Sequence, residues 1–182
     1  MRKLYWFQND LRLSDNPGLR AQMDAEGLLL VYLLPVNRPW CNTTGMGGQR
    51  ERFLRESLQS LQQSLSALGQ NLLVLEGSPE LVIPDLVRDY SIDAVATSPV
   101  PGYYERKTLN LLRSRLKVPL LVHGSNTLFD RGDLPFALTD LPRHFTPFRQ
   151  AVENLQMRPA LASPASLPPP PALRFHSVPP AS

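Results

Sequence analysis

The architecture of this chain is set by its first strand and the loop after it, Leu4-Tyr5-Trp6-Phe7-Gln8-Asn9-Asp10-Leu11-Arg12-Leu13-Ser14-Asp15-Asn16-Pro17. Residues 4–7 are aromatic or aliphatic, which predicts a short buried strand. The chain turns polar at Gln8, and Asp15 or Asn16 followed by proline is a helix-start signal. In an open parallel sheet, ligands bind outside the carboxyl ends of the strands. The polar residues at this strand end are therefore our first candidate site residues: Gln8, Asn9, Asp10 and Arg12.

The rest of the chain alternates between apolar runs and amphipathic segments. The apolar runs predict further strands at 28–34, 72–75, 94–97 and 120–122. Helices are predicted at 17–25, 49–68, 79–90, 103–116 and 146–157, with Gly27 ending the first and Pro84 kinking the third or delaying its start. The second helix carries an apolar stripe formed by Phe53, Leu54, Leu58, Leu61, Leu65 and Leu68. This alternation predicts an α/β fold with a five-stranded parallel sheet, a Rossmann-like three-layer sandwich.

The composition changes sharply at the C-terminal end. Residues 158–182 are about one third proline and show no hydrophobic periodicity, so we expect them to bury no core. We expect a semi-extended, Pro-rich interdomain linker or disordered tail. The predicted organisation is thus an α/β domain at 1–157 and a tether at 158–182 that leads to a second domain.

The overall composition is that of an ordinary globular protein. The chain has 182 residues, is 42% hydrophobic and carries a formal net charge of +3, which is too weak to indicate nucleic-acid binding by itself. The single cysteine, Cys41, excludes an intrachain disulfide and fits a reducing compartment. Without a long apolar run or a secretory signal we expect a cytoplasmic protein that contacts no membrane. The three histidines are scattered, so no metal site is predicted.

Several familiar binding motifs are missing. No G-x-G-x-x-G follows the first strand, and no G-x-S-x-G elbow occurs. The glycine-rich stretch 45–48 lacks the lysine and the spacing of a phosphate loop. The basic residues of the fourth predicted helix are interpreted as a solvated face, with a phosphate-binding face as the alternative. Physical reasoning from the residues alone therefore stops at an α/β domain with a cleft at its first strand.

Four motifs resemble the photolyase/cryptochrome family. Residues 6–17 read WFQNDLRLSDNP, similar to the family signature W-F-R-x-D-L-R-L-x-D-N-P. Residues 52–58, RFLRESL, resemble its F-L-x-E-S-L helix, and residues 69–80, GQNLLVLEGSPE, resemble its G-x-x-L-x-V-x-x-G-x-P-E segment. TLF at 127–129, DLPF at 133–136 and FTPFR at 145–149 are especially like the DASH-type cryptochromes.

This resemblance implies a blue-light flavoprotein of which the chain is the N-terminal α/β domain. Family members follow that domain with a linker and a helical domain that holds FAD, binds DNA and carries the light-driven repair of pyrimidine dimers. The α/β domain often binds an antenna chromophore: a folate (methenyltetrahydrofolate), a deazaflavin or a flavin nucleotide. We therefore expect a helical FAD domain as partner, in cis or in trans, with DNA contacted only through it. The chain alone is expected to bind no catalytic FAD and to carry no catalytic residue.

The chain departs from the family pattern at places that bear on the antenna. Gln8 stands where an arginine is usual, and Ser14 where a histidine is common. The loop that in DASH members resembles E-V-x-x-E-E is here VPGYYE at 100–105, so only Glu105 keeps a carboxylate that could contact a pterin. The alternative, which the residues favour, is that Glu105 is a first-turn carboxylate that favours the helix dipole. Asp10 and Arg12 either pair locally or contact a ligand or a second domain.

Two alternatives to an antenna domain are open. One is a degenerate, non-catalytic interaction module of the same fold, favoured by the prolines at 99 and 101 and by the lost arginine. The other is a nucleotide-binding α/β protein, against which the missing phosphate loop speaks.

Overall fold

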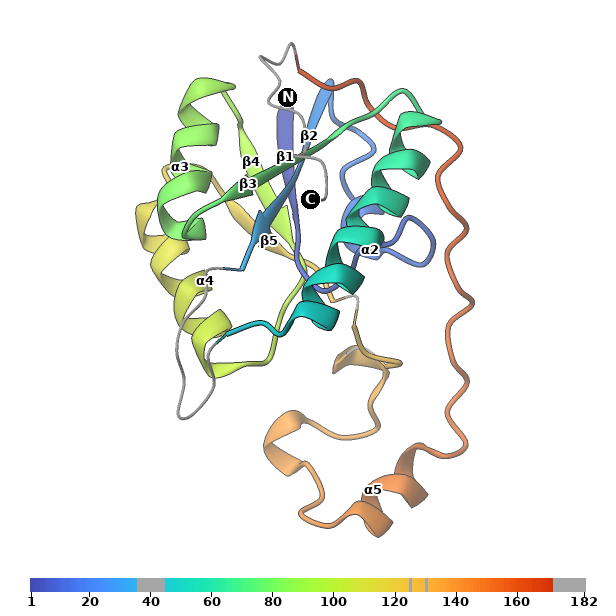
Figure 1. The fold of residues 1–182 in the computed structure, drawn as a ribbon. Helices are drawn as coiled ribbons and strands as arrows, with labels where there is room; N and C mark the ends of the chain where they lie inside the picture. The colour runs from blue at the N-terminus through green and yellow to red at the C-terminus, as the bar shows by residue number, and fades with distance from the viewer. Residues whose placement is uncertain (36–44, 125, 130, 172–182) are drawn as a thin grey trace.

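The computed structural model describes residues 1–35, 45–124, 126–129 and 131–171 (Figure 1). Strands and helices alternate along the chain up to the fifth strand, and short helices follow. Their bounds are β1 Arg2–Phe7, α1 Pro17–Arg20, β2 Gly27–Leu34, α2 Gly48–Ser66, β3 Leu72–Glu76, α3 Pro79–Asp89, β4 Ala94–Thr97, α4 Tyr103–Arg115, β5 Leu120–Val122, the 3₁₀ helices Arg131–Asp133 and Leu138–Asp140, and α5 Phe145–Val152.

The five strands form one parallel sheet in the order β3-β2-β1-β4-β5. The chain starts in the middle and builds outward in both directions, so β1 and β4 flank the point where the strand order reverses. Helices α1 and α2 cover one face of the sheet, and α3 and α4 cover the other (Figure 1). The predicted α/β sandwich with a five-stranded parallel sheet is confirmed.

Alternate residues of the central strand supply two cores. Leu4 and Trp6 pack with residues of α3 and α4, such as Ile83 and Leu112. Tyr5 and Phe7 pack on the other face with Leu19 of α1 and with the leucines of α2, Leu58, Leu61 and Leu65. Because both faces of β1 and β2 are covered, these strands contain continuous apolar runs rather than alternating ones.

Two helix predictions need correction near prolines and glycines. Helix α1 ends at Arg20, not at residue 25, and Gly27 is the first residue of β2 rather than a cap. The Gln22 side chain donates from Nε2 to the Gly18 carbonyl at 2.8 Å, which takes the acceptor that the next helical backbone bond would use. Helix α3 begins at Pro79, so Pro84 does not delay its start.

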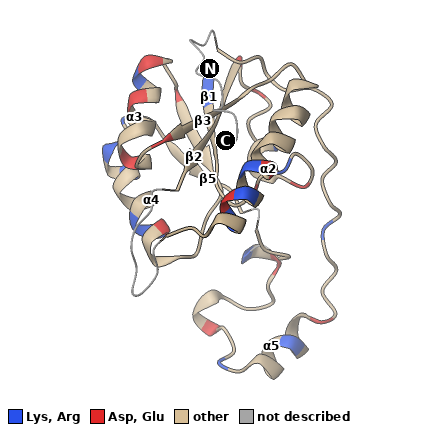
Figure 2. Ribbon diagram, in the orientation of Figure 1, with Lys and Arg blue, Asp and Glu red and all other residues tan. Residues whose placement is uncertain are grey.

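Pro84 is accommodated in α3 by a neighbouring helix. A proline has no N–H to offer the carbonyl four residues earlier, here that of Glu80. Arg115 of α4 donates to this carbonyl from Nη1 at 3.1 Å. The other basic residues of α4, Arg106, Lys107 and Arg113, are exposed (Figure 2).

The apolar stripe predicted on α2 is only partly buried. Leu58, Leu61 and Leu65 are buried, whereas Phe53 is 70% exposed. Helical periodicity indicates which side of α2 is apolar, but the first turns of α2 extend beyond the sheet. The last helix is also shorter than predicted, since α5 ends at Val152. Trp40 and Cys41 lie outside the described residues.

The described residues after β5 form two segments that we name. The arm, residues 126–129 and 131–157, stands away from the sandwich and contains α5 (Figure 1). The strap, residues 158–171, has no helix or strand and returns along the α2 side of the domain (Figure 1). We expected these residues to bury no core, but Pro164 and Pro168 are buried and Leu167 packs against the core on the α2 side, so the strap makes specific contacts with the domain.

The strap is attached at both ends. Near its start, Arg158 donates from Nη1 to Oδ1 of Asp15 at 2.7 Å, and the Asp15 backbone N–H donates to the Leu161 carbonyl at 2.7 Å. Near its end, the Leu28 N–H donates to the Pro169 carbonyl at 2.9 Å. The buried Gln70 amide donates to the Pro168 carbonyl. The strap therefore connects the loop after β1 to the opposite edge of the sheet, where β2 begins.

Candidate functional site

The loop after β1 is organised around a buried carboxylate, Asp10. Its side chain is 1% exposed and accepts a hydrogen bond at Oδ2 from the Tyr5 hydroxyl. The other carboxylate oxygen, Oδ1, accepts from the Gln8 backbone N–H at 2.9 Å. Asn16 completes the arrangement, because its Oδ1 accepts from the Leu19 N–H at 2.9 Å and its Nδ2 donates to the Arg12 carbonyl at 3.1 Å. One amide thus caps α1 and fixes the loop.

The Tyr5 hydroxyl is held in its neutral form. Burial, with the charge of Asp10 as the second cause, raises the pKa of Tyr5 above its ordinary value of 10.0. The phenol consequently remains a donor throughout the physiological range. Tyr5 and Asp10 therefore hold the loop by an internal bond, and Asp10 presents almost no surface to a ligand.

Gln8 bridges the two strands at which the strand order reverses. Its Nε2 donates to Oγ1 of Thr97 at 2.9 Å and to the Ser98 carbonyl at 2.8 Å. The Thr97 hydroxyl in turn donates to the Trp6 carbonyl at 2.8 Å. A neutral amide therefore closes the carboxyl ends of β1 and β4 together, where the family pattern has a cation. The Ser98 Oγ beside it is buried and has no hydrogen-bond partner among the described residues.

Arg12 is bound to its own loop. Its guanidinium donates to the Asp15 carbonyl from Nη2 at 2.8 Å and from Nε at 3.2 Å. Its backbone N–H donates to the Asp10 carbonyl at 2.6 Å, so the two residues are joined through the main chain. Asp15 has a positive φ of 48°, a conformation that aspartate tolerates better than most residues, and this turns its carboxylate toward the strap. The hydrogen bond from Arg158 is the main cause that lowers the pKa of Asp15.

The two remaining predicted site residues are exposed. Asn9 lies at the loop tip after β1. Glu105 lies in the first turn of α4, and its carboxylate folds back over Gly102, where an added Cβ would overlap it. This position near a helix N-terminus stabilises a negative charge. All five predicted residues therefore follow the carboxyl ends of β1 and β4, and no hydrogen bond among the described residues joins Glu105 to the other four.

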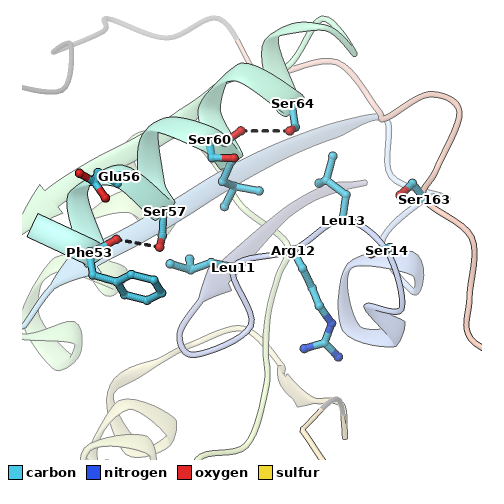
Figure 3. A pocket seen from close by; sticks show the side chains of 11 residues that line it. Leu11, Arg12, Leu13, Ser14, Phe53, Glu56, Ser57, Ser60, Ser64 and Ser163 are labelled. Atoms are coloured by element: carbon cyan, nitrogen blue, oxygen red, sulfur yellow. Dashed lines mark hydrogen bonds between the residues drawn. The ribbon is translucent and has the colours of Figure 1, made fainter. Parts of the chain in front are cut away.

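A groove lies between this loop and helix α2 (Figure 3). It measures about 510 Å³ and is lined by Leu11, Arg12, Leu13, Ser14, Phe53, Glu56, Ser57, Ser60, Leu61, Ser64 and Ser163. Figure 3 shows Leu11 beside the Phe53 ring and the Arg12 guanidinium pointing away from α2. The hydroxyls of Ser57 and Ser64 donate to backbone carbonyls one turn earlier in the helix. The groove thus combines apolar side chains with polar ones, and two of its serine hydroxyls are bonded within α2.

A second hollow of about 550 Å³ lies at the carboxyl ends of β2 and β3. It is lined by Leu34, Pro35, Met46, Glu51, Leu54, Arg55, Glu76 and Gly77. Glu51 and Arg55 form an ion pair on α2 at 2.8 Å, so the charges of this wall largely neutralise each other. Its Met46 comes from the glycine-rich stretch 45–48, for which we predicted no phosphate binding.

Sequence reasoning missed three residues of this region. Tyr5 and Thr97 were assigned only to strands, and Ser98, the residue after the second of these strands, was not singled out. Their role depends on β1 and β4 being neighbours, which a linear pattern does not show. Within the described residues, no group of histidine, cysteine and acidic side chains is suited to a metal ion. No helix of the described residues is long and apolar enough to cross a bilayer.

Comparison with known proteins decides the family. A family model described as DNA photolyase matches residues 3–171. This chain belongs to the DNA photolyase family. It is 38% identical over 174 residues to a cryptochrome DASH from Idiomarina loihiensis, covering 89% of this chain and 38% of that protein. It is 33% identical to a cryptochrome DASH from Vibrio parahaemolyticus, covering 92% of this chain and 39% of that one.

Solved structures of photolyases and cryptochromes have the same fold. A Synechocystis cryptochrome superposes with a TM-score of 0.90 at 29% identity, over 99% of this chain and 40% of its own. An archaeal photolyase from Sulfolobus tokodaii, solved with two FAD molecules, superposes with a TM-score of 0.76 at 21% identity, over 91% of this chain and 38% of its own. The chain thus spans under half the length of the relatives that it matches and corresponds to the family's N-terminal α/β domain. The resemblance to DASH-type cryptochromes is confirmed.

Proposed function

We propose that this chain acts as the N-terminal domain of a blue-light flavoprotein of the photolyase/cryptochrome type, binding an antenna chromophore and supporting a helical FAD domain. One observation carries the proposal. Nearly the whole chain superposes on about two fifths of a cryptochrome. FAD, DNA contact and any photolyase reaction then belong to the helical domain, joined in cis or in trans. The single cysteine supports a cytoplasmic site of action.

The residues present fit an antenna in part. Asn9 and Glu105 are exposed polar groups at the carboxyl edge of the sheet, and Arg12 adds a cation there. A Glu105 carboxylate can accept hydrogen bonds from a pterin ring. Gln8 and Asp10 would support the ligand indirectly, because their side chains already hold β4 and the loop. When bound, a folate, flavin or deazaflavin would supply absorption of near-ultraviolet or blue light.

Reconstitution of the purified chain tests the antenna. We expect the chain to take up methenyltetrahydrofolate or FMN, and the absorption of the bound chromophore to be red-shifted or its fluorescence quenched. Glu105→Gln, which keeps the side-chain shape and removes the charge, should weaken folate uptake about tenfold, since charge-assisted hydrogen bonds are the stronger ones. Glu153→Gln at the C-cap of α5 is the matched control. A chain that binds neither chromophore would contradict the antenna function.

The non-catalytic interaction module is the second candidate, and a specific observation favours it. Gln8 fills the switch point with a neutral amide whose Nε2 donates two hydrogen bonds, in place of the family's arginine. Such a domain would keep the fold and the contact with a FAD domain without a chromophore. Association with a flavin-loaded helical domain, together with no chromophore uptake by the chain itself, would select this candidate. The third candidate is a nucleotide-binding α/β protein. Calorimetry with ATP should show no micromolar binding to this chain, because its sequence contains no phosphate loop.

A further inference from the structure

Helix α4 and the two residues after it carry an unbalanced positive charge. Residues 103–117 contain five cations and one acid, Glu105, which gives this segment a formal charge of +4, compared with +3 for the whole chain. All five cations are exposed (Figure 2). They are Arg106, Lys107, Arg113, Arg115 and Lys117. The positive charge of the chain is therefore concentrated on the surface of one helix.

The arginines of the other two long helices are mostly paired. On α2, Arg52 and Arg55 each pair with a glutamate one turn away, at 2.9 and 2.8 Å. On α3, Arg88 pairs with two aspartates at 2.8 and 2.9 Å. None of the five cations of 103–117 forms an ion pair with any residue that the structure describes. The surface of α4 therefore keeps a positive potential that acidic neighbours largely cancel on α2 and α3.

The stability of α4 explains only the cations at its end. Arg113 and Arg115 lie in the last turn, where the helix dipole favours positive charge, and Arg115 also donates to the Glu80 carbonyl. Arg106 and Lys107 lie near the start of the helix, where the dipole disfavours positive charge. Their side chains do not support the helix, so their charge is available to a partner.

The cations follow one side of α4. Arg106 and Arg113 are seven positions apart, which is two turns and about 10 Å along the helix axis. Asn110 lies between them, one turn from each, and adds an exposed polar side chain. A nucleic-acid strand in a duplex carries one negative charge about every 3.4 Å along the axis. A strand lying along α4 therefore brings several phosphates within reach of these side chains.

Two exposed tyrosines begin the same helix. Tyr103 is 66% exposed and Tyr104 is 50% exposed, and their rings meet edge to face with centroids 5.3 Å apart. Tyr103 precedes Arg106 by three positions and Lys107 by four, so the three side chains are neighbours on the helix surface. Cations that follow a backbone, combined with aromatic rings on which bases stack, are the features that bind single-stranded nucleic acids. An acidic peptide would use the cations but offers no bases to the rings.

We propose that the exposed side of α4 binds a single-stranded nucleic acid without sequence preference. Its cations hold the phosphates and its tyrosines stack on the bases. The residues that carry this are Tyr103, Tyr104, Arg106, Lys107 and Arg113. The inference goes beyond the proposed function and does not rest on it. It also differs from the expectation that DNA is contacted only through the helical domain, because α4 adds a contact made by this chain itself.

Fluorescence anisotropy with an undamaged, labelled oligothymidine of about 15 nucleotides, kept in the dark, tests the proposal. We expect the full chain to bind it at about 0.15 M salt. The logarithm of the association constant should fall with the logarithm of salt concentration with a slope of about −2, since each of three neutralised phosphates contributes about −0.7. Arg106→Gln/Arg113→Gln should reduce this slope by about 1.4 and weaken binding about tenfold at 0.15 M salt.

The control removes the same charge from arginines that are already paired. Arg52→Gln/Arg88→Gln lowers the net charge of the chain by the same two units, and both arginines are exposed. We expect it to change the affinity less than about twofold, because these charges are cancelled locally. Circular dichroism should be the same for all variants, since every substituted residue is exposed.

A second pair of variants separates stacking from charge. Tyr103→Ala/Tyr104→Ala should weaken oligothymidine binding at least about fivefold without changing the salt slope. The same variant should bind inorganic polyphosphate as the wild type does, because polyphosphate has no bases.

The remaining outcomes would overturn the proposal. Binding that disappears below 0.15 M salt, or that falls equally in Arg106→Gln/Arg113→Gln and in the control, would show only attraction to the net charge. Oligothymidine binding that is insensitive to the tyrosine substitutions would replace the nucleic acid by any polyanion. Uptake of a chromophore by the chain is measured separately, so its success or failure changes none of these results.

Discussion

The bond between Tyr5 and Asp10 makes a prediction whose size and pH dependence both follow from the structure. Tyr5→Phe removes a fully buried hydroxyl that donates to a carboxylate with only 1% exposure. Hydrogen bonds to charged groups contribute about 1.5–3 kcal/mol, so we expect the free energy of unfolding at pH 7 to fall by about 2 kcal/mol. The Gln8 N–H would remain as the closest donor to Asp10.

The difference between wild type and Tyr5→Phe should vanish at high pH. The folded-state pKa of Tyr5 lies above its ordinary value of 10.0, so the stability that comes from its neutral hydroxyl is complete below pH 10 and is lost as the pH rises further. The loss is about 1.4 kcal/mol per pH unit for one proton. A difference of about 2 kcal/mol should therefore disappear about one and a half units above pH 10.

Urea unfolding followed by circular dichroism between pH 7 and about pH 11.5 measures this. Tyr103→Phe, which alters a tyrosine that is 66% exposed, is the control and should change stability by less than about 0.5 kcal/mol at any pH. Tyr32 is present in all variants, so its own titration cancels in the comparison. A Tyr5→Phe effect below about 0.5 kcal/mol at pH 7, or one that is independent of pH, would refute the buried bond.

Three further predictions follow from neighbouring contacts. Gly18→Ala should destabilise the chain by about 1–3 kcal/mol although alanine favours helices, because a Cβ there would lie 2.7 Å from Oη of Tyr5. Urea titration of the same substitution in a Tyr5→Phe background should show a smaller loss of stability. Gln70→Ala should cost about 1–3 kcal/mol, because this amide is 1% exposed and its partners would be left unpaired, and limited proteolysis should then cleave the strap faster. Arg158→Ala should also loosen the strap, and its effect on the urea midpoint should fade as the pH falls through the lowered folded-state pKa of Asp15; an effect that persists in acid would contradict the pairing.

The local elements could be predicted because their signals are local. The strands at 94–97 and 120–122 have the predicted bounds. The strand predicted at 72–75 is β3, which extends one residue further, to Glu76. Each is a short apolar run between turn residues, and such a run must be buried wherever it lies in the sheet. The proline after a capping position likewise marks the starts of α1 and α3.

The candidate site was only partly predictable for the opposite reason. Gln8, Asn9, Asp10 and Arg12 could be placed together because they follow one strand. That Asp10 is buried, and that Gln8 binds a threonine 89 positions later, depends on which strands become neighbours. The exposure of Phe53 similarly depends on where the sheet ends beneath α2.

The sequence by itself determined the fold class, the position of the first strand and the family, because hydrophobic periodicity and short motifs are properties of contiguous residues. The tertiary structure alone decided the roles of these residues. It turned the aspartate and glutamine after β1 into internal supports, attached the proline-rich strap to a loop 143 positions earlier, and left the arm uncovered. Pairings across such separations are set by which surfaces must be buried together when the whole chain packs, and no local pattern carries that information.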